Sequence, residues 1–323
     1  MKAVRIDEFG GTEVLKLVEV ERPVPAPDEI LLKVLASGVN LVDCVIRAGT
    51  NDNFKSFLKL PLILGCDAAG IIEEVGSEVT NLKIGDHVYG CPNFPGDGSY
   101  AEYCAAKAEK FALKPKSISF TEAAGVPLAA LVAWEGLFEL GKLQAGQHIL
   151  IHGASGGVGS FALQLAKAKG AYVIGTTSDS NLEFLKQIGA DKVINYKTQN
   201  FEEIVKDIDL VFDASPLRDN IERLKGISVL KEGGIFVSVN VDFPFDDAVN
   251  AALALKNAKG EMVAGQKHQN LPEIAKLIDE GKVKVTISKV YPLEQVALAQ
   301  EESVTGHVRG KLVLEIQKLT KKA

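Results

Sequence analysis

The sequence lacks the features that define several large classes of protein. It has four cysteines among 323 residues and no Cys-x-x-Cys pair, which argues against a zinc knuckle and against a disulfide framework. No window approaches the roughly 18 consecutive apolar residues of a membrane-spanning helix. The first eleven residues, MKAVRIDEFGG, have no apolar core of signal-peptide length. We therefore expect a cytoplasmic protein in a reducing setting, without a membrane partner.

Strongly basic stretches are also missing. The chain has 42 acidic and 36 basic residues, a net charge of −6, and no long basic run. Proteins that bind nucleic acids usually carry clustered Lys and Arg side chains, so we expect no nucleic-acid partner. A hydrophobic content of 46% and a charged content of 24% are typical of a globular protein, and the length is sufficient for two domains.

The pattern of the chain changes near residue 121. Before it, short apolar runs such as 31–35 and 69–75 are separated by turn signals, which predicts mostly β structure. Thr121 is expected to cap a helix, and from residue 147 strands and helices alternate. The expected strands are 148–152, 172–176, 192–195, 209–213, 234–239 and 260–264, with helices near 157–169, 180–188, 219–230 and 244–257. This alternation predicts an α/β fold with a parallel, doubly wound sheet.

The last part of the chain contains further expected elements. A helix is expected over 271–281, followed by strands at 283–285 and 310–316. These strands exceed what a six-stranded sheet needs, so we expect them to return to the first domain. The prediction is a doubly wound domain over 123–265 and a discontinuous, mostly β domain formed by 1–122 and 266–323.

A glycine-rich turn joins the expected strand 148–152 to the expected helix 157–169. It reads Ala154, Ser155, Gly156, Gly157, Val158, Gly159, the Gly-x-Gly-x-x-Gly pattern with alanine in the first place. A backbone without side chains can approach a pyrophosphate closely, and the unpaired amides at a helix start offer it donors. An ordinary tight turn is the alternative, but the flanking strand and helix favour a dinucleotide site.

Several short motifs follow one another along nearly the whole chain. They are SGVNLVD at 37–43, LGCDAAG at 64–70, GDHV at 85–88, GSYAEY at 98–103 and GHVRGK at 306–311, together with the glycine turn. In this order they resemble the medium-chain dehydrogenase/reductase superfamily, and within it the zinc-independent, zeta-crystallin-like quinone oxidoreductases. The resemblance implies a GroES-like, partly barrel-like catalytic domain, a Rossmann domain, and hydride transfer from a nicotinamide coenzyme.

The zinc enzymes of this superfamily hold their metal with a cysteine after Gly-Val and with the histidine of Gly-His-Glu. Asn40 and Cys66 stand at those positions here, and catalytic zinc needs about three protein ligands. We therefore expect no metal, and Cys66 to be a small buried residue. Without zinc the protein has no Lewis acid to stabilise an alkoxide, so we expect the hydride to be transferred to an electron-poor substrate. We expect reduction of a quinone by NADPH; an alkenal or enone reductase is the alternative, and a low-turnover NADPH-binding sensor is a further one.

Two residues are candidates for catalysis through the resemblance. In similar reductases the positions of Asn40 and Asp43 lie near the nicotinamide and the substrate. The Asn40 amide can donate to a carbonyl or to a ribose hydroxyl, and Asp43 could orient Asn40 or deliver a proton. Both residues could instead simply cap the helix that follows.

The coenzyme is predicted to be NADP(H). An NAD site usually has an acid at the end of the second Rossmann strand, but here Thr177 and Ser178 leave room for a phosphate. Asn181 stands where relatives commonly carry a basic residue. Tyr196, followed by Lys197, matches a pair that approaches the 2′-phosphate in relatives, and Arg309 could supply charge. Relatives also often pair the edge strands of their Rossmann sheets, so we expect a homodimer through strand 260–264.

Overall fold

The structure is a computed structural model that describes residues 1–92, 96–264 and 267–318. The chain divides into two compact units. Unit 1 consists of Met1–Leu128, His268–Glu280 and Val285–Ala323, and unit 2 of Ala129–Lys267 and Gly281–Lys284. The predicted domain boundary between 265 and 266 falls on two residues outside the described part of the chain.

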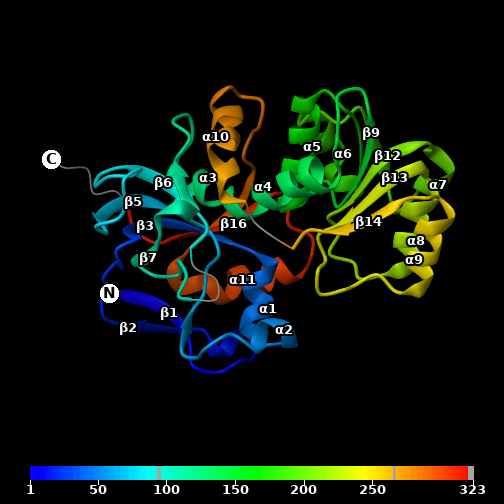
Figure 1. Ribbon diagram of the computed structural model, residues 1–323. Helices are drawn as coiled ribbons and strands as arrows, with labels where there is room; N and C mark the ends of the chain where they lie inside the picture. The colour runs from blue at the N-terminus through cyan, green and yellow to red at the C-terminus, as the bar shows by residue number, and fades with distance from the viewer. Residues whose placement is uncertain (93–95, 265–266, 319–323) are drawn as a thin grey trace. The chain divides into compact units, whose positions relative to one another are not determined.

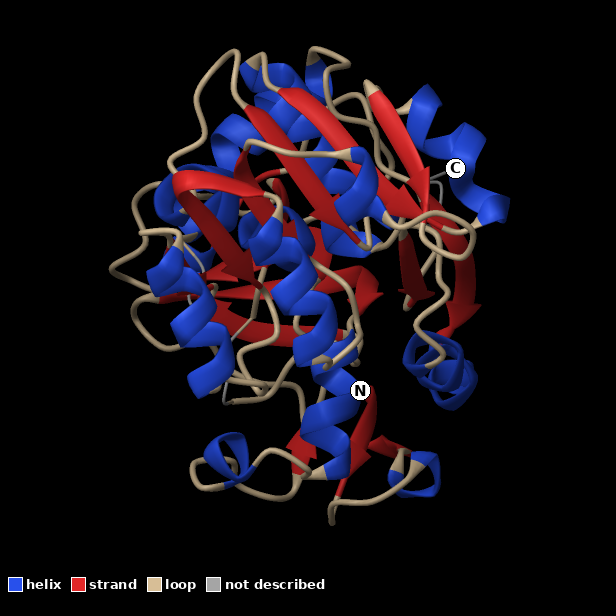
Figure 2. Ribbon diagram, turned by 90° about the vertical axis from the view of Figure 1, so that its right-hand side faces the viewer, coloured by secondary structure: helices blue, strands red, loops and turns tan. Residues whose placement is uncertain are grey.

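Unit 2 is built on a parallel sheet, which in the described residues has six strands in the order β11-β10-β9-β12-β13-β14. The strands are β9 (His148–His152), β10 (Tyr172–Thr177), β11 (Lys192–Asn195), β12 (Ile208–Asp213), β13 (Leu230–Ser238) and β14 (Lys259–Met262). The helices are α5 (Gly157–Lys169), α6 (Leu182–Gln187), α7 (Phe201–Ile204), α8 (Asn220–Ser228) and α9 (Asp247–Leu255). Helices α5 and α6 cover one face of the sheet and α7 to α9 cover the other (Figures 1 and 2). The predicted doubly wound α/β fold is therefore confirmed.

The central strand β9 shows why this segment forms a buried parallel strand. Ile149, Leu150 and Ile151 have no exposed surface, because helices cover both faces of the sheet. The strand order reverses between β10 and β12, on either side of β9. In open α/β sheets the ligand site lies beyond the carboxyl ends of the strands at such a reversal. The glycine turn follows β9 at this point.

Unit 1 is mostly β, as predicted. Its described residues form a seven-stranded sheet of β15 (Ile287–Pro292), β16 (Lys311–Glu315), β3 (Glu29–Val39), β5 (Ala68–Val75), β6 (His87–Gly90) and β8 (Phe111–Leu113), with β7 (Tyr103–Lys107) also paired to β3. A second sheet contains β2 (Lys16–Glu19), β1 (Lys2–Ile6) and β4 (Leu62–Ile63). The helices include α1 (Leu41–Ala48), α2 (Asp52–Lys55), α3 (Phe120–Ala124), α10 (Leu271–Asp279) and α11 (Val296–Val304), and α4 (Pro127–Trp134) starts in unit 1 and continues into unit 2.

The long strand β3 organises unit 1. It pairs antiparallel with β5, with β7 and with the late strand β16, so segments separated by more than 200 positions share one sheet. Its side chains Leu31 and Leu32 have no exposed surface. Directly after β3, the chain enters helix α1, whose N-cap is Asn40. The end of β3 therefore delivers Asn40 to a fixed place beside the start of β16.

Two local predictions are wrong. The N-cap of helix α3 is Ser119, not Thr121: the Ser119 hydroxyl accepts from the Glu122 N–H at 3.2 Å, and the Glu122 carboxylate accepts from the Ser119 N–H at 2.8 Å. This reciprocal Ser-x-x-Glu box satisfies two free amides, whereas Thr121 would satisfy one. The strand expected at 283–285 is a loop, and the strand begins at Ile287, where β15 pairs in parallel with β16.

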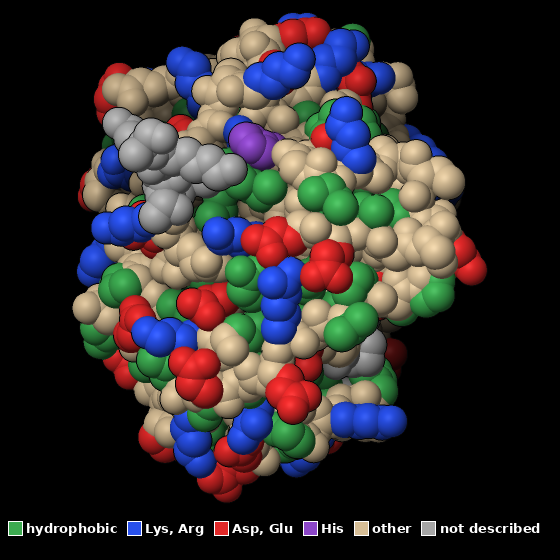
Figure 3. Space-filling view, turned by 90° about the vertical axis from the view of Figure 1, so that its left-hand side faces the viewer, with side chains coloured by type: hydrophobic (Ala, Val, Ile, Leu, Met, Phe, Trp, Pro, Cys, Tyr) green, Lys and Arg blue, Asp and Glu red, His purple; other side chains and the backbone are tan. Residues whose placement is uncertain are grey.

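Acidic and basic side chains are interspersed over the face of the molecule drawn in Figure 3. In the described residues, no helix combines the length and the apolar character that a membrane span requires.

Candidate active site

The glycine turn of unit 2 is shaped by two of its glycines. Gly153 has a φ of 66°, in the left-handed region that favours glycine, and a Cβ there would lie 2.6 Å from the carbonyl oxygen of Ala214. A Cβ on Gly159 would lie 2.2 Å from the carbonyl oxygen of Gly153. Helix α5 can therefore pack this closely against the turn only because residue 159 has no side chain.

Ala154, which replaces the first glycine of the pattern, is fully buried. Its methyl group lies 3.1 Å from the place that a Cβ on Gly175 of strand β10 would occupy. The missing side chain at Gly175 thus makes room for the extra methyl at Ala154. The departure from the motif is compensated on the neighbouring strand.

The start of helix α5 offers unpaired donors. Its N-cap is Gly156, which has no side chain that could cap the helix. The first amides of a helix have no intrahelical acceptor, and here they belong to Gly157, Val158 and Gly159. A Cβ on Gly156 would meet only the Gly153 carbonyl within 4 Å, at 3.4 Å, so the turn is open on this side. These donors and the helix dipole fit a phosphate group.

Three of the predicted coenzyme-binding side chains converge beside the turn. Thr177 Oγ1 donates to Ser155 Oγ at 3.0 Å, and Asn181 Nδ2 donates to the same oxygen at 3.4 Å. Thr177 and Asn181 are buried, which holds their rotamers. The end of β10 is therefore connected to the glycine turn by neutral hydroxyl and amide groups.

The acid in the loop after β10 is engaged by the neighbouring strand. The Asp179 carboxylate accepts a short hydrogen bond from the side-chain amide of Asn195, at the end of β11. Ser178 Oγ lies 3.3 Å from Ser180 Oγ. Tyr196 is half exposed, and its backbone N–H donates to the Thr177 carbonyl at 3.1 Å. The side chains of Ser178 and Tyr196 thus lie at this edge of the sheet.

In unit 1, the amide of Asn40 lies between two opposite charges. Its Nδ2 donates to Asp67 Oδ2 at 2.9 Å, and its Oδ1 accepts a short hydrogen bond from the Lys311 ammonium. Asn40 is 8% exposed, so only a small part of it can meet a ligand. The side chain is held in place rather than free to turn.

Asp43 lies in the first turn of α1 and is fully buried. Its carboxylate accepts three hydrogen bonds: from the backbone N–H of Asn40 at 2.9 Å, from the Tyr100 hydroxyl at 3.0 Å and from the Cys66 N–H at 3.1 Å. Burial raises the pKa of Asp43, and the hydrogen bonds oppose that rise. Asp43 thus makes the capping contact that the sequence allows, and that contact fixes the backbone of Asn40.

Two charged residues of this cluster received no role from the sequence. Asp67 has no exposed surface, and its Oδ1 accepts the Leu128 N–H at 2.7 Å. Lys311 is 4% exposed and forms an ion pair with Asp67 at 3.4 Å. Both stand in motifs that carry the resemblance, 64–70 and 306–311, and each lies beside an apolar run, where a charge commonly faces solvent at a strand end. Nothing local marks these two as buried partners.

The surroundings of Cys66 do not favour a metal ligand. Burial, followed by the nearby charge of Asp43, raises the pKa of the Cys66 thiol well above its usual value. Cys66 is half-buried and not fully buried as expected, and one thiol falls short of the roughly three protein ligands that catalytic zinc needs. Within residues 1–92, 96–264 and 267–318, no group of three or more His, Cys, Asp or Glu side chains is placed to hold a metal ion.

The predicted site residues form two sets. Unit 2 contains the glycine turn, Thr177, Ser178, Asn181 and Tyr196. Unit 1 contains Asn40, Asp43 and Arg309. Arg309 is exposed in the loop before β16, two positions from the buried Lys311.

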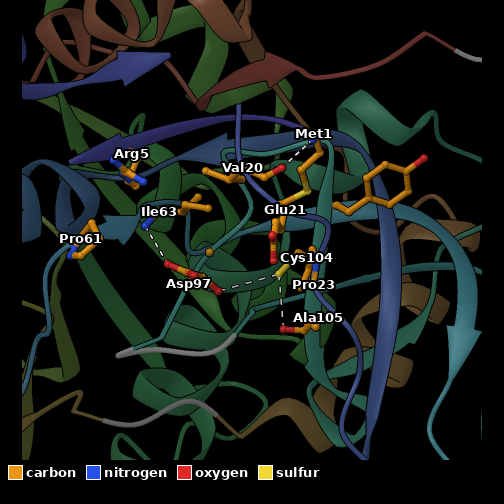
Figure 4. Close-up of a pocket in the computed structure, with 12 residues that line it drawn as sticks. Met1, Arg5, Val20, Glu21, Pro23, Pro61, Ile63, Asp97, Cys104 and Ala105 are labelled. Carbon is orange, nitrogen blue, oxygen red and sulfur yellow. Dashed lines mark hydrogen bonds between the residues drawn. The ribbon is translucent and has the colours of Figure 1, made fainter. Parts of the chain in front are cut away.

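Unit 1 also has a hollow of about 360 Å³ that includes none of the predicted site residues (Figure 4). Two of its polar groups are paired within the protein. Asp97 Oδ1 accepts the Ile63 N–H at 2.9 Å, and the Met1 ammonium donates to the Val20 carbonyl at 2.7 Å. We therefore take the two sets above, each within its own unit, as the candidate site residues, and not the lining of this hollow.

Comparison with known proteins identifies related families. Residues 26–116 match the alcohol dehydrogenase GroES-like domain family, and residues 188–314 match the zinc-binding dehydrogenase family. The chain is 37% identical to the NADPH-dependent alkenal/one oxidoreductase of Arabidopsis thaliana, over 97% of this chain and 79% of that relative. It is 33% identical to the quinone oxidoreductase of Mus musculus, over 97% of both chains.

A solved structure shows the same architecture. The quinone oxidoreductase from Coxiella burnetii superimposes with a TM-score of 0.89 at 35% identity, over 98% of this chain and 99% of that one. The chain belongs to the medium-chain dehydrogenase/reductase superfamily, and it is an oxidoreductase of the group that contains the quinone oxidoreductases and the alkenal/one oxidoreductases. The resemblance inferred from the motifs is confirmed.

Proposed function

We propose that the protein reduces quinones by hydride transfer from NADPH. The observation that carries this proposal is the open, glycine-capped start of α5 beside the cluster of Ser155, Thr177 and Asn181, which fits a dinucleotide phosphate. The quinone oxidoreductase relatives at 33% and 35% identity support the acceptor. In this proposal unit 2 binds the coenzyme and unit 1 contributes the catalytic residues.

NADPH is favoured over NADH by the end of strand β10. No acid stands at its last residue, Thr177, or at Ser178, and the acid that follows, Asp179, already accepts a hydrogen bond from Asn195. Ser178, Tyr196 and Lys197 instead offer hydroxyls and an ammonium to a 2′-phosphate, and the exposed Arg309 stays a candidate for a further positive charge. The Arabidopsis relative is named as NADPH-dependent.

In the reaction, NADPH when bound supplies a hydride, and the quinone gains that hydride and one proton to become a hydroquinone. Negative charge develops on the quinone oxygen as the hydride arrives. The Asn40 amide has a second Nδ2 hydrogen that can donate to this oxygen. Asp43 is fully buried and accepts three hydrogen bonds, so we assign it the role of orienting Asn40 and not that of delivering the proton.

Reduction of an alkenal or enone is the second candidate. The relative with 37% identity is an alkenal/one oxidoreductase, which favours this acceptor class. The same amide donor would stabilise the enolate oxygen, while the hydride goes to the β-carbon and a proton to the α-carbon. The chemistry demanded of Asn40 is identical for both classes.

The test is NADPH oxidation measured with a panel of quinones and of α,β-unsaturated aldehydes and ketones. Turnover with quinones supports the main proposal, and turnover with enals or enones alone selects the second candidate. Binding of NADPH without oxidation by any acceptor would contradict both and favour a low-turnover sensor. Asn40→Ala is expected to lower kcat/KM far more than it weakens NADPH binding.

We also propose that the reaction needs no metal. A single cysteine, Cys66, together with the Asn40 amide falls short of the roughly three protein ligands that catalytic zinc needs. Metal analysis of the purified protein is expected to find no stoichiometric zinc, and treatment with a chelator is expected to leave turnover unchanged. One tightly bound zinc per chain would contradict this proposal.

A homodimer is the proposed assembly. Strand β14 is the last strand of the unit 2 sheet and pairs with β13 on one side only among the described residues. An unpaired strand edge can pair with the same edge of a second copy. Sedimentation at micromolar concentration tests this, and a monomer would contradict it.

A further inference from the structure

Lys311 is a buried cation at the start of strand β16. Its ammonium has three acceptors: the Val39 carbonyl at 3.3 Å, Asp67 Oδ2 at 3.4 Å and, at closer range, Asn40 Oδ1. A buried lysine is costly unless its charge is paired and its three N–H groups are bonded. All three are bonded here, and the closest acceptor is the side chain of Asn40.

Asp67 bonds the other end of the same amide. Its Oδ2 accepts from Asn40 Nδ2 at 2.9 Å, while its Oδ1 is held by the Leu128 N–H at 2.7 Å. The ammonium of Lys311 therefore faces the amide oxygen, and the carboxylate of Asp67 faces the amide nitrogen. A 180° rotation of the amide would turn its NH₂ group to the ammonium and its oxygen to the carboxylate. The ion pair permits one orientation only.

The fold assembles this arrangement from distant parts of the chain. Strand β16 runs antiparallel to β3 with Leu312 opposite Val39, and this register sets Lys311 beside Asn40. A Cβ on Gly38 would lie 2.6 Å from Asp67 Oδ2, so the missing side chain there leaves room for the carboxylate. Strand pairing, the glycine and the two charges all act on one amide.

We propose that Lys311 is a positioning residue for the reaction, which together with Asp67 fixes the Asn40 amide so that its second Nδ2 hydrogen faces the substrate oxygen. This inference rests on the proposed role of Asn40. The ammonium also polarises the amide, because a positive charge at Oδ1 strengthens the N–H groups as donors. The late strand β16 thereby contributes to the site although Lys311 does not itself touch the substrate.

A purely structural role for Lys311 leads to a different expectation. If the ammonium only neutralised the buried carboxylate of Asp67, then removing both charges together would restore turnover as well as stability. If it positions Asn40, the uncharged pair would restore stability alone. The double variant Asp67→Asn/Lys311→Met separates these two cases, and it keeps the test valid if Lys311→Met alone fails to fold.

The kinetic experiment compares Lys311→Met, the double variant and the control Lys289→Met. Lys289 lies on the neighbouring strand β15 with its side chain 55% exposed. We expect kcat to fall about 10- to 100-fold in Lys311→Met and in the double variant, because the amide loses its orientation. The KM for NADPH is expected to change by less than about twofold, and the control to match the wild type. Wild-type kcat in the double variant would overturn the proposal.

A second measurement needs no turnover. The side-chain ¹⁵N–¹H signals of Asn40, assigned by their loss in Asn40→Ala, report exchange of the amide with solvent. For the Nδ2 hydrogen that is bonded to Asp67, we expect slow exchange in the wild type and exchange at least about tenfold faster in the Lys311 variants. Unchanged exchange overturns the positioning role. Wild-type turnover in Asn40→Ala would instead overturn the proposed role of Asn40, and the exchange data would still decide whether Lys311 holds the amide.

Discussion

The hydroxyl of Tyr100 donates a hydrogen bond to Asp43 at 3.0 Å, and both side chains are fully buried. The two residues belong to different motifs, 57 positions apart in the sequence. The phenol is one of three donors that keep the Asp43 carboxylate in place, and Asp43 in turn holds the backbone of Asn40. Tyr100 is therefore connected to the candidate catalytic amide through a single intermediate residue.

Tyr100→Phe is expected to lower the free energy of unfolding by about 1–2 kcal/mol, because a buried carboxylate loses a donor. The folded-state pKa of Asp43 is already raised by burial, and it rises further in the variant. A folded carboxyl with a raised pKa loses stability as the pH rises above its unfolded pKa, near 3.9. Wild type and variant lose this stability equally until the pH reaches the wild-type folded pKa of Asp43, so the deficit of the variant should grow only above that pKa.

Denaturant unfolding at several pH values measures this difference. The control is Tyr103→Phe, which removes a phenol oxygen from a less buried ring and is expected to change the stability by less than about 0.5 kcal/mol. Equal effects of the two substitutions would contradict the role given to the Tyr100 hydroxyl.

Asp213, at the end of β12, provides a pH-dependent prediction. Burial raises its pKa to about 6, although hydrogen bonds from the Ser215 N–H and the Ser238 hydroxyl oppose the rise. The folded protein therefore holds a proton that the unfolded chain releases near pH 4, and stability falls as the pH rises from about 4 to about 6. Asp213→Asn removes this loss. The stability of Asp213→Asn relative to the wild type should therefore increase as the pH rises from about 4 to about 6.

The matched variant Asp209→Asn should show the opposite pH dependence: its stability relative to the wild type should decrease as the pH rises. Burial alone would raise the pKa of Asp209, but hydrogen bonds from Lys231 and from the His148 N–H lower it overall. The stability that Asp209 contributes is present above its unfolded pKa and is lost as the pH falls through the folded pKa. Thermal unfolding of both variants from pH 3 to pH 7 tests the pair. If the stabilities of the two variants relative to the wild type changed with pH in the same direction, the pKa shift of one of the two carboxylates would have the wrong sign.

Ser178→Asp is expected to impair the use of NADPH specifically. An acid at the end of β10 would repel the 2′-phosphate and could accept from a ribose hydroxyl. The KM for NADPH should rise about tenfold or more while the KM for NADH stays within about twofold, because only NADPH carries the phosphate. The control Ser178→Asn has the same shape without the charge and should leave both values near those of the wild type. If Ser178→Asp left both KM values unchanged, Ser178 would not border the phosphate.

Alanine substitutions at two glycines of the turn should fail in different ways. In Gly159→Ala the new Cβ would meet the Gly153 carbonyl at 2.2 Å, so we expect a loss of stability of about 1–3 kcal/mol. In Gly156→Ala the nearest atom is at 3.4 Å, so the fold should tolerate the methyl. The methyl would lie at the helix start, where we place the phosphate, and should weaken NADPH binding. Thermal unfolding and coenzyme titration of both variants would distinguish them, and a stable Gly159→Ala would contradict the packing argument.

The strand, turn and helix around residues 148–169 were predictable because their signals are local. An apolar run, a set of glycines and a 3.6-residue periodicity each act within a few positions, and the structure shows β9 and α5 where they are expected. The parallel sheet followed from the same kind of alternation. The cap of α3 at Ser119 was missed because two capping patterns overlap there, and the reciprocal Ser119–Glu122 box satisfies more backbone groups than Thr121 would.

The environment of Asn40 could not be predicted from local sequence signals. Its partner Asp67 lies 27 positions away, and its partner Lys311 lies 271 positions away. Local periodicity cannot show that a charged residue at a strand end is buried, because the same pattern occurs where the charge faces water. Only the antiparallel pairing of β16 with β3 brings the ammonium to the amide. The residue types and the glycine turn are properties of the chain, but the orientation of the candidate catalytic amide depends on strand pairing and on the burial of two opposite charges.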